Sequence, residues 1–234
     1  MTQPTSESSL WQGVKDLIGD RAVTLGNHWS FNLRNDPKRL PFVLSRYKFA
    51  ARMACRGRSV LELGCSEGIG TPILAEFATS YTGVDMDGPA VAAAQRNFPA
   101  ENRTFLTGDF LRKSYGSFGA VVSLDVVEHI VPEIEEQYFD TVAMNLDSEG
   151  IAVIGTPNKT SEAYASTMSK AGHVNVFDGQ HLMKAMRRVF HNVFPFGIND
   201  EVVHTGYSPM CHYLVYVGCN KIGSPQRSEV ADGR

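Results

Sequence analysis

The chain has 234 residues, of which 43% are hydrophobic, and this composition suits one globular domain with some decoration. Its formal net charge of −3 excludes a broad basic surface for nucleic acid. The four cysteines form no C-x-x-C pair, which argues against a zinc ribbon or redox dithiol and favours a reducing, cytoplasmic compartment. The sequence shows neither a secretory-signal pattern nor an apolar run of about 18 residues, so we expect no membrane contact.

Strand-like and helix-like segments alternate between two polar ends, residues 1–9 and 224–234, which we expect to be disordered. Helices are expected at residues 40–53, 71–79, 88–97, 133–145 and 180–190. Strands are expected at residues 59–63, 81–85, 103–107, 119–124, 151–156, 191–196 and 211–219. This alternation predicts an α/β, Rossmann-like fold: a seven-stranded, mostly parallel sheet with helices on both faces. No helix separates the last two strands, so an antiparallel edge strand is also expected.

A glycine-rich segment, VLELGCSEGIG, follows the first strand and contains Gly64, Gly68 and Gly70. Its spacing differs from the G-x-G-x-x-G dinucleotide pattern, and alone it is also typical of an ordinary strand-to-helix turn. Asp85 ends the second strand, where a carboxylate can accept two hydrogen bonds from a ribose diol. Helix capping is the other role for this residue, but Asp87 is better placed for that. Together the loop and Asp85 predict a ligand that carries a ribose.

The third strand ends in LTGDF, which contains Asp109 and Phe110. The carboxylate can accept a hydrogen bond from an exocyclic amine, and the phenyl ring offers an apolar face to a flat heteroaromatic base. Alone, Gly-Asp is ordinary turn chemistry.

The fourth strand runs into three polar residues in SLDVVEHI: Asp125, Glu128 and His129. If the chain turns helical after Leu124, their spacing places all three on one helical face. Such a group suits a substrate site, a catalytic base, a metal site or a structural helix cap.

Taken together and in this order, VLELGCSEGIG, YTGVDMD, LTGDF and GAVVSLDVVEHI resemble the class I S-adenosylmethionine-dependent methyltransferases over residues 58–160. The resemblance implies that the glycine loop approaches the methionine part of the cofactor, Asp85 holds the ribose, and Asp109 and Phe110 flank the adenine. The implied cofactor-binding residues are Glu62, Gly64, Cys65, Gly68, Asp85, Met86, Asp109, Phe110 and Leu124. The loop departs from the family at Ser66-Glu67, a change that we interpret as tuning the loop without abolishing binding. Residues 58–222 would form the methyltransferase core, 1–57 an extension with substrate-lid helices, and 223–234 a flexible tail.

The D-x-x-E-H sequence resembles two subgroups that use a divalent metal, the ubiquinone-biosynthesis O-methyltransferases and the small-RNA 3′-end 2′-O-methyltransferases. The second subgroup adds a later histidine, and His173 stands at about that place. The resemblance implies a Mg²⁺ site made by Asp125, Glu128, His129 and His173. Two alternatives stay open: His129 acts as a base or orienting group without a metal, with Asp125 and Glu128 positioning it, or the three residues are structural only.

Two segments are candidates for the substrate wall. The N-terminal extension offers Trp29, Phe31, Arg46 and Tyr47, although a packing helix with a solvated basic face explains them as well. The segment NDEVVHTGYSPMCH offers Asp200, Glu201, His204, Tyr207 and His212, polar groups that suit a sugar or sugar nucleotide. From these segments and the later histidine, the residues expected to bind substrate are Trp29, Tyr47, His173, His204 and Tyr207.

The main hypothesis is an S-adenosyl-L-methionine-dependent methyltransferase that methylates a hydroxyl of a small polar metabolite. N-methylation of an amine and a non-catalytic cofactor-binding module are the alternatives. A nicotinamide-dependent dehydrogenase is disfavoured by the glycine spacing, and RNA methylation by the acidic balance. We therefore expect a small-molecule substrate and no nucleic-acid partner, and a homodimer stays open.

Overall fold

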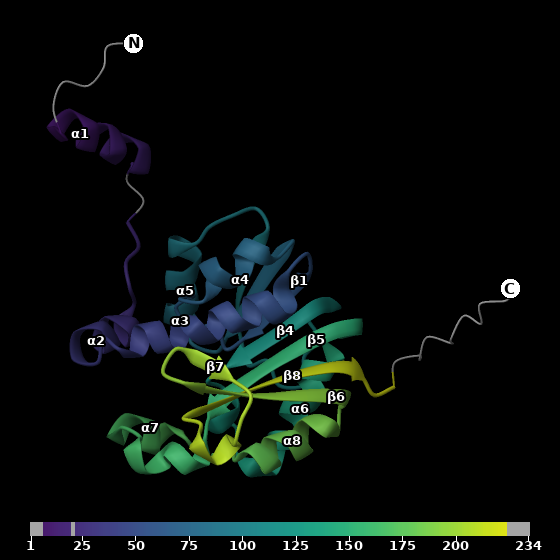
Figure 1. Ribbon diagram of the computed structural model, residues 1–234. Coiled ribbons are helices and arrows are strands. Elements are labelled where there is room, and N and C mark those ends of the chain that lie inside the picture. Colours follow the sequence, from purple (N-terminus) through teal and green to yellow (C-terminus); the bar gives the residue numbers. More distant parts are fainter. Residues whose placement is uncertain (1–6, 20–21, 224–234) are drawn as a thin grey trace, which may run out of the picture.

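The computed structural model describes residues 7–19 and 22–223 (Figure 1). One mixed sheet has the strand order β3-β2-β1-β4-β5-β8-β6-β7. Its strands are β1 Ser59–Leu63, β2 Ser80–Asp85, β3 Arg103–Thr107, β4 Phe118–Leu124, β5 Leu146–Pro157, β6 Phe190–Asn199, β7 Val202–His204 and β8 Tyr213–Lys221. The five strands from β3 to β5 in this order pair in parallel, which confirms the predicted Rossmann-like architecture.

The antiparallel part of the sheet differs in detail from the prediction. In the described part of the chain eight strands form where seven were expected, because the short β7 pairs with the end of β6. The last two predicted strands, β6 and β8, pair antiparallel as expected, and β8 lies between β5 and β6. The β6–β7 hairpin therefore forms the outer border on that side.

Helices cover both faces of the sheet, as predicted (Figure 1). The α-helices are α1 Glu7–Ile18, α2 Asn27–Asn35, α3 Arg39–Ala50, α4 Thr71–Phe77, α5 Gly88–Asn97, α6 Glu135–Met144, α7 Thr167–Gly172 and α8 Gly179–Arg187. A π-helical turn, Ala51–Cys55, extends α3, and 3-10 turns lie at Val127–His129, Pro132–Ile134, Lys159–Tyr164 and Ser208–Met210. One hydrophobic cluster joins α3, α4 and α5 to the sheet, and a second joins α6 and α8 to the opposite face.

The N-terminal extension forms two different structures. Residues 7–9 were expected to be disordered, but they begin α1, while residues 1–6 and 224–234 lie outside the described residues. Helix α1 stands apart from the domain in Figure 1, and none of its residues is buried in the described part of the chain. Helices α2 and α3, by contrast, place Trp29 and Tyr47 in the core. No helix within the described ranges is long and apolar enough to cross a bilayer.

The topology fixes where a ligand can bind. From the central β1 the chain builds outward to β2 and β3, and it then returns to β4 on the other side of β1. The carboxyl ends of β1 and β4 therefore flank the point where strand order reverses, and such points open a crevice in parallel sheets.

Candidate active site

A cavity of about 550 Å³ opens at this reversal point. Most of the residues singled out in the sequence line it, together with side chains from the N-terminal extension. These residues are Trp29, Tyr47, Gly64, Cys65, Asp85, Met86, Asp109, Phe110, Leu124, Asp125, Glu128, His129 and His173. Its volume is within the usual range for small-molecule and cofactor sites.

The glycine loop and Asp85 form one end of the cavity. Gly64 has a φ of +85°, and a Cβ there would lie 2.3 Å from Cγ2 of Val126, so both the conformation and the space require glycine. Asp85 accepts hydrogen bonds from the backbone N–H groups of Ser66 at 2.8 Å and Asp87 at 2.9 Å. These bonds fix the carboxylate, and each oxygen keeps a further lone pair for a ligand hydroxyl.

Two predicted cofactor residues do not line the cavity. Gly68, with a φ of +75°, instead packs close to Ala94. Glu62 is buried behind the wall, where its carboxylate accepts hydrogen bonds from the hydroxyls of Tyr47, at 2.8 Å, and Tyr81. Burial raises the pKa of Glu62 to about 7. Both carboxylate oxygens are engaged, so Glu62 holds the wall in place and does not face a ligand.

Asp125 does not continue into the expected helix. Its φ is +58°, and the following residues form only the 3-10 turn Val127–His129, so Asp125 does not share a helical face with Glu128 and His129. Instead, Nη1 of Arg46 donates to both carboxylate oxygens of Asp125, at 2.7 and 2.8 Å. The guanidinium also stacks on the Tyr213 ring, with its carbon 3.7 Å from the ring centroid. This pair satisfies the negative charge of Asp125 and holds the residue at the cavity wall.

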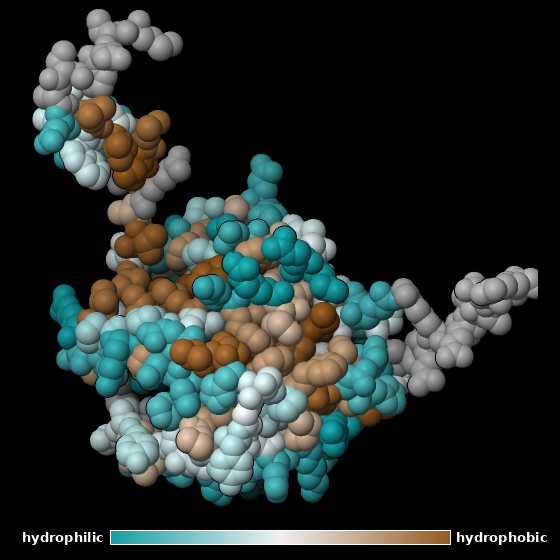
Figure 2. Space-filling model, in the orientation of Figure 1, coloured by the Kyte–Doolittle hydropathy of each residue, from teal (hydrophilic) through white to brown (hydrophobic). Residues whose placement is uncertain are grey.

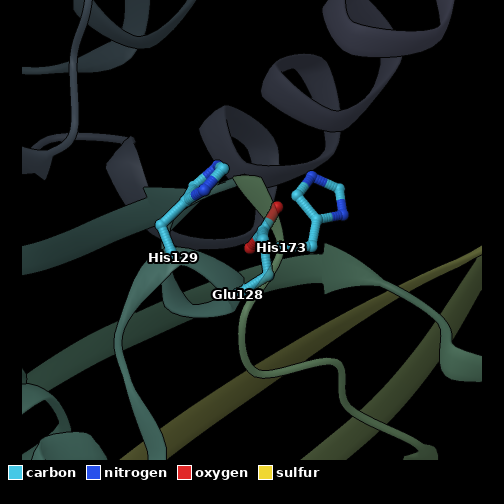
Figure 3. Close-up of side chains that lie close together, drawn as sticks. All are labelled: Glu128, His129 and His173. Atoms are coloured by element: carbon cyan, nitrogen blue, oxygen red, sulfur yellow. The ribbon is translucent and has the colours of Figure 1, made fainter. Parts of the chain in front are cut away.

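Glu128, His129 and His173 do come together, each offering one ligand atom within 4.8 Å of the others. Figure 3 shows the Glu128 carboxylate between the two imidazole rings. Its Oε2 accepts a hydrogen bond from Thr156 at 3.0 Å, whereas its buried Oε1 has no partner in the described part of the molecule. Burial raises the pKa of Glu128 to about 8, and burial lowers the pKa of His173.

The tautomer of His129 follows from its contacts. Nδ1 lies 2.8 Å from the carbonyl oxygen of Gly172, and a carbonyl can only accept, so Nδ1 carries the proton. The other nitrogen, Nε2, is then left with a free lone pair when the ring is neutral. His129 can therefore act as a base or as a metal ligand through Nε2.

The donor atoms of this cluster suit a cation. Two imidazoles and one carboxylate with a free oxygen fit a divalent cation whose remaining positions go to water or substrate. Asp125, the fourth predicted ligand, is engaged by Arg46 and is not part of the cluster.

A second cavity of about 590 Å³ adjoins the first and shares Arg39, Asp125 and His173 with it. Most of its lining residues are polar or charged, among them Lys38, Arg46, Asn158, Ser161, Ser166, Ser169, Lys170 and His212. Arg39 has no ion-pair partner among residues 7–19 and 22–223. Sequence reasoning missed Arg39 because nothing in its local pattern distinguishes it from a solvated basic residue.

Two predicted substrate residues lie elsewhere. Pairing of β7 with β6 holds His204 opposite Gly197 at the outer border of the sheet, and Tyr207 follows in an exposed turn. Neither lines the cofactor-sized cavity or the cavity beside it. The segment instead borders a third cavity of about 720 Å³ against α8, so substrate binding by His204 and Tyr207 stays a prediction.

Two further residues were missed by the sequence analysis. His28 lines the cavity next to Trp29, and burial lowers its pKa. Glu67, which the sequence showed only as a departure from the family pattern, accepts hydrogen bonds from the backbone N–H groups of His28 and Trp29. No local signal reveals a contact between residues so far apart in the chain.

Comparison with known proteins agrees with this fold. A methyltransferase domain family matches residues 36–189, and the chain belongs to it, within the class I S-adenosylmethionine-dependent methyltransferases. A probable S-adenosylmethionine-dependent methyltransferase of Mycobacterium tuberculosis is 29% identical over 159 residues, which are 67% of this chain and 53% of that protein. A ubiquinone biosynthesis O-methyltransferase of Caulobacter vibrioides is 27% identical over 150 residues, 59% of each chain. This chain thus spans little more than half the length of these relatives.

Solved structures share the fold. The N-methyltransferase NodS of Bradyrhizobium japonicum, in complex with S-adenosyl-L-homocysteine, matches with a TM-score of 0.58 at 17% identity. The match covers 90% of this chain and 97% of that one.

Proposed function

We propose that this protein transfers a methyl group from S-adenosyl-L-methionine to a hydroxyl of a small polar metabolite. The observation that carries the proposal is the position of Glu128, His129 and His173: all three line the cofactor-sized cavity, and His173 also lines the second cavity. The family supplies the reaction class, and the names of the mycobacterial and ubiquinone-pathway relatives support the cofactor and an oxygen acceptor.

The first cavity fits the cofactor in size and in chemistry. Asp85 would accept hydrogen bonds from the ribose hydroxyls, Asp109 would accept one from the adenine amine, and Phe110 would contact the adenine face. The left-handed Gly64 lets the backbone come close to the methionine part, where a side chain would block it. When bound, the cofactor supplies a methyl group on a positively charged sulfur.

Transfer to a hydroxyl needs a group that takes the hydroxyl proton. His129 would accept it at Nε2, because Nδ1 donates to the Gly172 carbonyl and holds the ring in place. An amine acceptor with a free lone pair does not need this base, which favours oxygen over nitrogen. The main contribution of the protein is then to orient the acceptor toward the methyl group.

A divalent cation at Glu128, His129 and His173 is the second form of the site. The observation that favours it is the buried, unpartnered Oε1 of Glu128, since an unsatisfied polar atom in the interior is costly. Bound there, the cation would supply Lewis acidity to an acceptor hydroxyl.

The second cavity favours an acceptor that is both hydroxylated and anionic. Lys38 lies within 4.0 Å of Asp36, and Arg46 is paired with Asp125, so two lining cations are balanced within the protein. Arg39, like Lys170 and Glu162 of the same lining, has no ion-pair partner within the described ranges, and it lies where the two cavities meet. Among the predicted sugar-like acceptors, a phosphorylated or carboxylated one would pair with this guanidinium.

Calorimetric titration tests the proposal directly. We expect S-adenosylmethionine and S-adenosylhomocysteine to bind and NAD, the control, not to bind. Repeating the titrations with Mg²⁺ and with EDTA separates the two forms of the site: a heat of Mg²⁺ binding that disappears in a Glu128→Gln variant supports the cation. Absence of binding by both sulfur ligands would contradict the proposed function.

A further inference from the structure

Helix α2 begins without a cap of its own. Its N-cap residue, Gly26, has no side chain to accept hydrogen bonds from the first free N–H groups of the helix. Glu67 takes this role from the glycine loop: Oε1 accepts from the N–H of His28 at 3.0 Å and Oε2 from that of Trp29 at 3.2 Å. Glu67 is only 7% exposed, so water competes little for these bonds.

The contact is closely fitted on both sides. A Cβ at Gly26 would lie 2.1 Å from Oε1 of Glu67, which means that any side chain at position 26 would displace the carboxylate or the helix. The Glu67 carboxylate can therefore reach the start of α2 only because position 26, about 40 residues away in the sequence, is a glycine.

Glu67 also connects two segments of the chain that line the cofactor cavity. Its neighbour Ser66 donates its backbone N–H to Asp85, the carboxylate placed for the ribose. On the other side, α2 carries the side chains of His28 and Trp29 to the cavity wall. One side chain thus joins the segment under the ribose position to the helix that covers the cavity.

We propose that Glu67 is a positioning residue that holds α2 over the cofactor cavity, so that cofactor affinity depends on this contact. The inference rests on the proposed use of the cavity for S-adenosylmethionine. Glu67 does not line the cavity and acts through His28 and Trp29. If α2 is in place only part of the time, the apparent Kd rises by the inverse of that fraction.

The test uses Trp29 as a reporter in the ligand-free protein. The chain has two tryptophans, Trp11 and Trp29, so a Trp11→Phe background isolates the second. Trp29 is 6% exposed in the unaltered protein. In the Trp11→Phe background, Glu67→Ala should expose Trp29 to water, and this should shift its emission to longer wavelength and increase acrylamide quenching. Calorimetry should show a Kd for S-adenosylhomocysteine raised about tenfold, which corresponds to about 1.4 kcal/mol.

Three further variants keep the test specific. Glu76→Ala, which removes an exposed glutamate on α4, should change neither readout. Glu67→Gln keeps the length and one acceptor and should give intermediate values. Gly26→Ala leaves Glu67 intact but removes its space, and it should reproduce the effect of Glu67→Ala, with little added when the two are combined.

The outcomes separate this inference from the proposed function. Failure of the unaltered protein to bind either sulfur ligand contradicts the function itself. Normal binding by the unaltered protein, together with an unchanged Kd or unchanged Trp29 emission in a folded Glu67→Ala variant, overturns the positioning role. Circular dichroism on each variant confirms that folded proteins are compared.

Discussion

At the scale of single residues, one unusual group is Glu62, a carboxyl 1% exposed in the sheet core between two tyrosine hydroxyls. Burial disfavours its charged form and raises its pKa from 4.5 to about 7. Between these two values the folded protein keeps a proton that the unfolded chain releases. The contribution of Glu62 to stability therefore falls as pH rises through this window, and it levels off above it.

We predict that Glu62→Gln removes this pH dependence. Urea unfolding at pH 5, 6, 7 and 8 should show the unaltered protein losing up to roughly 3 kcal/mol relative to the variant across the window. The lost acceptor oxygen in the variant adds only a constant offset. Glu76→Gln on exposed α4 serves as the control, and a difference between unaltered protein and Glu62→Gln that does not vary with pH would contradict the shifted pKa.

His129 carries a second prediction at this scale. Replacing it by alanine should slow methyl transfer to an acceptor found by screening hydroxylated anions by about 100-fold, because general base catalysis is lost. Affinity for S-adenosylhomocysteine should stay within about twofold. An exposed histidine on β6 gives the matched control, His191→Ala. Unchanged transfer by the His129 variant would remove this residue from the mechanism.

At the scale of elements, the glycine loop after β1 determines whether the cavity exists at all. Gly64→Ala forces an L-residue into a φ of +85° and pushes a methyl group into Val126. We expect unfolding to become easier by about 2 kcal/mol and cofactor binding to be lost. Thermal unfolding and calorimetry measure the two effects.

The matched control for the loop is Gly88→Ala at the start of α5. A Cβ there makes only ordinary contacts, the nearest at 3.5 Å from Thr107, so stability and binding should be unchanged. Equal behaviour of the two alanine variants would mean that the loop tolerates a side chain at position 64.

The elements with strong local signals were predicted from the sequence. Strands β1 and β3 and helix α5 have the predicted bounds, since β1 is a buried run, β3 a short run of strand-forming residues and α5 an alanine-rich run, each closed by turn residues. Helix α2 was missed because NHWSFNLRN has no apolar repeat, and Glu67, distant in the sequence, caps it. Helix α1 was missed although its apolar residues, Leu10, Trp11, Val14, Leu17 and Ile18, have helical spacing.

In the candidate site, too, the features with a local sequence signal were predicted and those that depend on distant contacts were not. Asp85, Asp109 and His129 converge as expected because the carboxyl ends of parallel strands meet at one edge of a sheet. The expected helix after Leu124 did not form, since Asp125 takes a left-handed conformation and pairs with Arg46, 79 residues away. Neither that pair nor the position of His204 at the sheet border has a local pattern from which to predict it.

At the scale of the whole molecule, the chain divides into a packed domain and the separate helix α1. Figure 2 shows apolar side chains gathered along one side of α1, and they belong to residues that are 40% to 81% exposed. The two hydrophobic clusters that hold the sheet contain no residue of this helix within the described ranges. The stability of the domain should therefore not depend on α1.

Two truncations test this division. Removing residues 1–19 should leave the Tm within about 2 °C of the full chain, because surface changes contribute about 0.5 kcal/mol or less. Removing residues 1–35 should lower it strongly, since α2 buries Trp29 and Asn32 against the domain. A large loss with the shorter truncation would show that the apolar side of α1 packs against the domain in solution. Equal Tm values for both truncations would mean instead that α2 adds nothing to the domain, and the cavity wall formed by His28 and Trp29 would then have no stable support.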